Sequence, residues 1–151
     1  MGLLDFGATR EYRPFFVNNY FRIIDGAANG DRDAVLEYSR KVGFLTGYES
    51  GVMNDAHVES VMILAEAFRV DAPFSFGAQN TTARMQELVP VMLKHRLCAP
   101  PPEVYSLHRK MSGLFLMAAK LKSEINCYHT WRTIANEFEE LHRVEQNSEH
   151  S

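Results

Sequence analysis

The stretch DAHVESVMILAEAF, residues 55–68, decides the character of the fold. Apolar side chains recur in it at intervals of three and four residues, which brings them to one face of an α-helix. These side chains are Val58, Val61, Met62, Ala65 and Phe68. Ile63 and Leu64 widen the stripe, so a helix that starts at Asn54 or Asp55 is expected to be buried on most sides.

The same spacing predicts five further helices around this one. Pro14 suits a first helical position and is expected to open the first of them, which Gly26 and Gly30 end. Asp31 is expected to cap the next helix, since its carboxylate can accept a hydrogen bond from a free backbone N–H of the first turn. The remaining three are predicted over residues 82–97, 104–122 and 128–142.

Together these elements predict a mainly α fold in which a short strand stub is followed by about six helices. Leu114, Phe115, Leu121 and Trp131 are expected in its core. The triple proline at 100–102 predicts an extended, rigid connection. We expect residues 1–145 to form the folded unit and the polar residues 146–151 to form a disordered tail. Such a chain looks like the helical half of a larger fold.

Composition excludes several classes of function. The 151 residues carry a net charge of −3, which gives no overall field for binding nucleic acid. Cys98 and Cys127 form neither a metal-binding pair nor a disulfide framework, and the histidines lack the spacings of a zinc site. The longest apolar runs, VMILA and GLFLMAA, are far shorter than the ~18 residues a membrane span needs, so no transmembrane segment is expected.

Charge is unevenly distributed along the chain. The segment 84–122 has seven basic residues against two acidic ones, Glu87 and Glu103, and so a net charge of +5. The basic residues, here called the basic belt, are Arg84, Lys94, Arg96, Arg109, Lys110, Lys120 and Lys122. One interpretation is a solvated face of two helices. The other is a surface for phosphates or an anionic membrane.

The triplet Asp5-Phe6-Gly7 near the start is the one motif that suggests chemistry. In protein kinases an Asp-Phe-Gly after a short strand holds the magnesium bound to ATP. Magnesium prefers carboxylate and phosphate oxygens, and a glycine lets the backbone turn sharply after the ligand. The alternative is an ordinary turn from a strand into a loop. Only six residues separate Gly7 from Pro14, which leaves no room for the segment that docks a peptide substrate.

Six segments in chain order carry a resemblance to a known family. They are LLDFGATREY (3–12), FLTGYES (44–50), DAHVESVMILAEAF (55–68), PFSFGAQNTT (73–82), LVPVMLKHRL (88–97) and PPPEVYSLHRKMSGLFLMAAKLK (100–122). Together they resemble the UbiB family of atypical kinases, and most of all its mitochondrial members required for coenzyme Q (ubiquinone) biosynthesis. The resemblance covers roughly residues 3–122.

The resemblance implies a protein-kinase-like fold, of which this chain would be the end of the C-terminal lobe. It implies binding of ATP and magnesium, and an ATPase-type activity that supports the quinone-biosynthesis enzymes. It also implies a mitochondrial location, at the matrix side of the inner membrane. On that pattern Asp5 is the magnesium ligand, and Phe6 and Gly7 complete the cofactor-binding turn.

The sequence lacks several motifs that the family carries. The Lys-x-Gly-Gln motif, the alanine-rich nucleotide loop, the ATP-binding lysine with its glutamate, and the catalytic-loop Asp and Asn are not present. We therefore assign no catalytic residue and expect a C-terminal fragment, without a targeting signal, that binds magnesium and ATP weakly or not at all by itself. Whether it is an enzyme stays open. The alternative is a non-catalytic helical module that binds a partner or a lipid.

Overall fold

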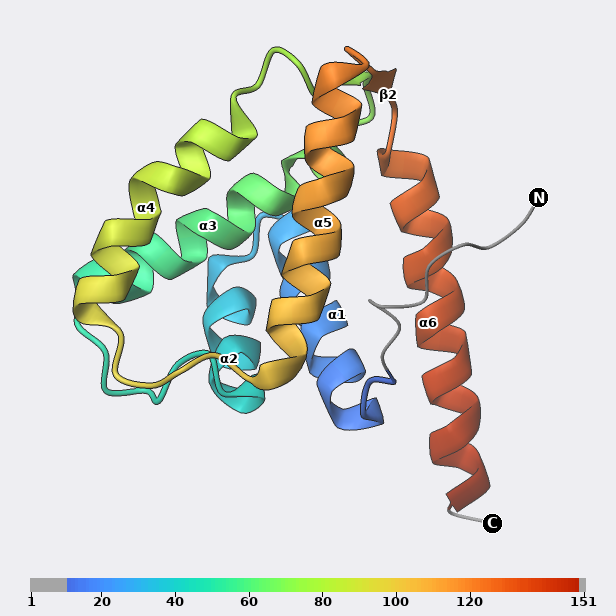
Figure 1. The fold of residues 1–151 in the computed structure, drawn as a ribbon. Coiled ribbons are helices and arrows are strands. Elements are labelled where there is room, and N and C mark those ends of the chain that lie inside the picture. The colour runs from blue at the N-terminus through green and yellow to red at the C-terminus, as the bar shows by residue number, and fades with distance from the viewer. Residues whose placement is uncertain (1–10, 150–151) are drawn as a thin grey trace.

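The structure, a computed structural model, describes residues 11–149, with side chains to residue 143. Within that range six helices and a two-stranded sheet follow one another along the chain (Figure 1). The elements are α1 (Pro14–Ala28), α2 (Arg32–Val42), α3 (Gly51–Arg69), β1 (Phe74–Ser75), α4 (Thr81–His95), α5 (Pro102–Lys120), β2 (Glu124–Ile125) and α6 (Tyr128–Glu149). The mainly α fold expected from the sequence is confirmed. The expected strand stub lies outside the described residues.

Local capping explains where α2 begins and ends and where α3 begins. The carboxylate of Asp31 accepts a hydrogen bond from the N–H of Ala34 at 2.9 Å, as expected for the cap of α2. Gly43 ends this helix with φ at +94°, a conformation that L side chains rarely adopt. The predicted start of α3 at Asn54 or Asp55 is wrong, because Ser50 caps the helix through the N–H of Met53 and α3 begins at Gly51.

The hydrophobic core lies where α1, α2 and α3 pack against one another. Its buried members are Ile23, Ile24, Ala27, Val35, Val58, Val61, Met62 and Ala65. Gly26 allows α1 and α2 to approach closely, since a Cβ there would lie 3.1 Å from the Cβ of Ala34. Four members belong to the stretch 55–68, which confirms that this segment organises the fold.

The remaining helices surround this core. In the view of Figure 1, α4 and α6 lie on opposite sides, and α5 lies between them in front of part of α1. Trp131 on α6 stacks between Phe21 and Phe68, with ring centroids 5.6 and 5.0 Å away. At the start of α5, the Arg13 guanidinium forms an ion pair with the buried Glu103 at 2.6 Å.

The predicted burial of α5 is largely wrong. Leu114 is 65% exposed and Leu121 is 72% exposed, while Phe115 is only half-buried. The periodicity predicted the helix correctly, but it did not predict how much of the helix surface is buried. Among the described residues α5 packs against few neighbours, so several of its apolar side chains stay exposed. Trp131 is also half-buried, although it packs against the core.

Two further features differ from expectation. The strands β1 and β2 pair antiparallel, with Phe74 opposite Ile125, and tie the end of α3 to the connection between α5 and α6. The helix α6 continues to Glu149, into the segment 146–151 expected to be disordered. Glu and Gln are good helix formers and can extend a helix beyond its last packed turn. The division of the chain at residue 145 stays a prediction.

Candidate functional site

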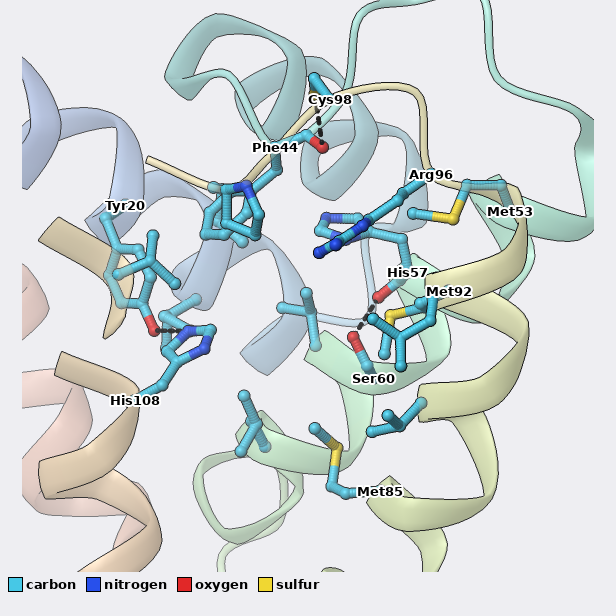
Figure 2. A pocket seen from close by; sticks show the side chains of 18 residues that line it. Tyr20, Phe44, Met53, His57, Ser60, Met85, Met92, Arg96, Cys98 and His108 are labelled. Carbon is cyan, nitrogen blue, oxygen red and sulfur yellow. Dashed lines mark hydrogen bonds between the residues drawn. The ribbon is translucent and has the colours of Figure 1, made fainter. Parts of the chain in front are cut away.

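The clearest candidate site within residues 11–149 is a cavity of about 310 Å³ with predominantly apolar walls. It lies between α1, α3, α4 and the start of α5, with the segment that leads into α5 (Figure 2). Three methionines, Met53, Met85 and Met92, contribute to its wall. Methionine is flexible and polarisable, so such a wall adapts to apolar ligands of different shape.

Helical spacing brings the lining side chains to the cavity. On α3 they are Met53, His57, Ser60, Val61 and Leu64, which share one face because they are spaced by three, four or one residue. On α4 Met85, Val89 and Met92 follow the same rule. These apolar side chains of α4 therefore face a cavity rather than a packed core.

His57 is a buried polar group of the wall. Its Nε2 lies 2.8 Å from the hydroxyl oxygen of Ser39, and the Ser60 hydroxyl donates to the His57 carbonyl at 2.7 Å. Burial lowers the pKa of His57 to about 4, more than the nearby Glu49 carboxylate raises it. His57 is therefore neutral at pH 7, and its imidazole contributes a polar contact without a charge.

A second polar pair lies on the other side of the cavity. His108 Nε2 is 3.2 Å from the hydroxyl of Tyr20, which also donates to the sulfur of Met111 at 3.4 Å. Burial raises the pKa of Tyr20 well above its ordinary value and lowers the pKa of His108. Both groups are neutral at pH 7, so they offer hydrogen bonds and no charge.

Arg96 and Cys98 follow the end of α4 and complete the lining. The Cys98 thiol lies 3.5 Å from the Phe44 carbonyl, to which it donates, and burial together with Glu49 raises its pKa. It is thus a thiol rather than a reactive thiolate. The Arg96 side chain points into the cavity (Figure 2) and forms no ion pair or side-chain hydrogen bond with the side chains of residues 11–143.

This geometry suits binding rather than catalysis. Within the described residues no group of three metal-ligating side chains comes together. The Ser39 hydroxyl beside His57 is fully buried and is not part of the lining, and the Cys98 thiol is protonated, so the lining presents no activated nucleophile. The arrangement can hold an apolar molecule and contact its polar end.

The described residues that the sequence singled out, those of the basic belt, do not gather at this cavity. Asp5, Phe6 and Gly7 lie outside the described residues. In the basic belt, Arg84 is paired with Glu66 at 2.7 Å, and only Arg96 lines the cavity. The cavity itself was missed, although Met85 and Met92, seven residues apart on one helix face, were its visible signal.

Comparison with known proteins connects the chain to kinases. It is 57% identical over 125 residues to "Atypical kinase coq-8, mitochondrial" of Caenorhabditis elegans, a match that covers 83% of this chain and 17% of that protein. It is 50% identical over 136 residues to "Atypical kinase COQ8B, mitochondrial" of Danio rerio, covering 90% and 22%. It is 43% identical over 134 residues to "Atypical kinase COQ8, mitochondrial" of Saccharomyces cerevisiae, covering 87% and 27%. No family model matches the chain.

Identity of this level over most of the chain, together with the helical fold, defines a segment of an atypical kinase. The chain belongs to the UbiB family and is similar to the COQ8 kinases within it, as the sequence motifs indicated. It spans only about a fifth of the length of these relatives. Their names also confirm the expected mitochondrial location, while the matrix side of the inner membrane stays a prediction.

No helix within the described residues is both long and apolar enough to cross a membrane.

Proposed function

We propose that this chain is the part of a COQ8-type atypical kinase that carries the magnesium ligand Asp5, and that the whole protein supports ubiquinone biosynthesis. The supporting observation is the 57% identity over 125 residues to the nematode kinase. Identity of that level between segments favours a common role in the whole proteins.

In this proposal Asp5 holds magnesium, and Phe6 and Gly7 form the turn that aims its carboxylate at the nucleotide. A carboxylate suits magnesium, which takes one or two protein oxygens together with phosphate oxygens and water. Phosphoryl transfer depends on charge stabilisation shared among a lysine, the metal ions and catalytic-loop residues. The 151 residues by themselves should therefore bind ATP weakly or not at all.

Rescue of a yeast strain tests the proposal. In the Saccharomyces cerevisiae kinase, the segment that matches this chain is replaced by the corresponding residues of this chain. The two segments are 43% identical. We expect the hybrid kinase to restore ubiquinone in a strain that lacks the yeast protein. A hybrid that accumulates to the normal level in mitochondria but restores no ubiquinone would contradict the proposal.

A second candidate role is contact with an anionic membrane surface. Leu114, Met117 and Leu121 on or just after α5 are exposed and share one face by their spacing of three and four residues. Lys110 precedes Leu114 by one helical turn and is also exposed. Exposed apolar side chains beside lysines favour the lipid-binding alternative as an additional property of the same chain.

A further inference from the structure

We propose that the cavity between α1, α3, α4 and the start of α5 is a binding site for a single-chain carboxylic acid, whose apolar chain lies among the methionines and whose carboxylate pairs with Arg96. The inference is independent of the proposed kinase role.

The apolar side chains of the cavity wall indicate that the ligand has an apolar chain. They are formed mainly by Met, Val, Leu and Ile side chains from α1, α3 and α4. A volume of about 310 Å³ lies at the lower end of the range for ligand sites, roughly 300–1,000 Å³. The cavity therefore suits one chain of medium length better than a bulky lipid with two chains.

Arg96 specifies the polar end. It is the one basic Lys or Arg side chain in the lining, and its guanidinium has no ion-pair partner among the described side chains of residues 11–143. A guanidinium matches a carboxylate with two parallel hydrogen bonds. Arg96 is exposed to solvent as well as lining the cavity, so a carboxylate can pair with it at the open end while the apolar chain lies among the methionines.

The other polar groups indicate a single negative charge. His57 and His108 are neutral near pH 7, so neither adds a positive charge. Glu49 is an acidic group close enough to His57 to raise its pKa. Its carboxylate accepts hydrogen bonds from the N–H groups of Thr46 and Gly47 in its own loop. A phosphate with two negative charges would be repelled by Glu49, and Arg96 could neutralise only one of those charges. A ligand with a single carboxylate is therefore favoured.

The methionine methyl groups provide the direct test. The chain is labelled with 13C at its methionine methyls and titrated with decanoate, decanol or butyrate below their aggregation limits. We expect decanoate to shift the signals of Met53, Met85 and Met92, and to leave the exposed Met117 on α5 unchanged. Decanoate should bind about tenfold more tightly than decanol, while butyrate should not bind measurably because it lacks most of the apolar chain.

Two matched variants separate charge from general binding. Arg96→Gln should remove the preference for decanoate over decanol, while Arg109→Gln, an exposed α5 side chain outside the lining, should keep it. Val89→Phe fills the cavity from a partly exposed position and should weaken both ligands. Absence of binding, shifts confined to Met117, or an unchanged preference in Arg96→Gln would each overturn the assignment. None of these results would bear on the kinase role, which ubiquinone rescue tests.

Discussion

The indole nitrogen of Trp131 donates a hydrogen bond to a carboxylate oxygen of Asp25 at 3.1 Å, and so joins α6 to α1 across 106 residues of sequence. Arg132 approaches the same oxygen at 3.5 Å and donates to Asn29 at 2.9 Å. Asp25 is thus the point on α1 where two consecutive α6 side chains converge. This contact, together with the Phe21–Trp131 stacking, fixes the position of α6 on the core.

Removal of the Asp25 carboxylate should loosen α6. Asp25→Ala leaves the indole N–H and the Arg132 guanidinium without their shared acceptor, and we expect it to lower the free energy of unfolding by about 1–2 kcal/mol. Urea unfolding followed by Trp131 fluorescence measures this change. Asp55→Ala on the exposed surface of α3 is the control and should change stability by less than about 0.5 kcal/mol. Equal effects of the two variants would contradict the role of Asp25.

The buried His57 predicts a loss of stability in mild acid. Its pKa in the folded chain is about 4, below the ordinary value near 6.5, so the unfolded chain binds this proton more strongly. The contribution of His57 is constant above pH 6.5 and is lost as the pH falls toward 4. Between pH 7 and pH 5 it should lower the free energy of unfolding by about 2 kcal/mol.

Denaturant unfolding of matched variants isolates this effect. His57→Gln should reduce the difference between pH 7 and pH 5, although not abolish it, because burial lowers the pKa of His108 as well. His95→Gln, at the end of α4, should retain the full difference. The same pH dependence in both variants would show that His57 is not the group responsible.

The basic belt predicts salt-sensitive binding to anionic vesicles. Arg109 and Lys110 are exposed on α5, and each basic residue near an anionic surface contributes about 1 kcal/mol. The double variant Arg109→Gln/Lys110→Gln should therefore bind such vesicles about thirtyfold more weakly in a sedimentation assay. Lys41→Gln on α2, outside the belt, should bind as the unmodified chain does. Equal binding of the unmodified chain to neutral and anionic vesicles would exclude the electrostatic interpretation.

Features governed by near neighbours in the sequence could be predicted, and those governed by distant contacts could not. The cap at Asp31 and the stripe of α3 follow from local chemistry, and both are confirmed. The exposure of Leu114 and Leu121 depends on what packs against α5, which periodicity does not reveal.

The cavity was missed for the same reason. Its wall combines Tyr20, His57, Met85 and Arg96, which tertiary packing alone brings together. Methionines spaced along one helix face give the same sequence pattern whether they pack against another helix or line a cavity. Asp5, Phe6 and Gly7 could be found from their motif, but they lie outside the described residues, and their role stays a prediction.

The most direct test of the central claim, that Asp5 is a magnesium ligand of an atypical kinase, is nucleotide binding by a hybrid protein. The chain replaces its matching segment in the Caenorhabditis elegans kinase, to which it is 57% identical, and ATP affinity is measured with and without magnesium. We expect magnesium-dependent binding that Asp5→Asn weakens at least tenfold, since an amide is a much poorer magnesium ligand than a carboxylate. The 151 residues alone should show no ATP hydrolysis above background. Unchanged magnesium-dependent binding in the Asp5→Asn hybrid, or hydrolysis by the chain alone that Asp5→Asn abolishes, would contradict the account.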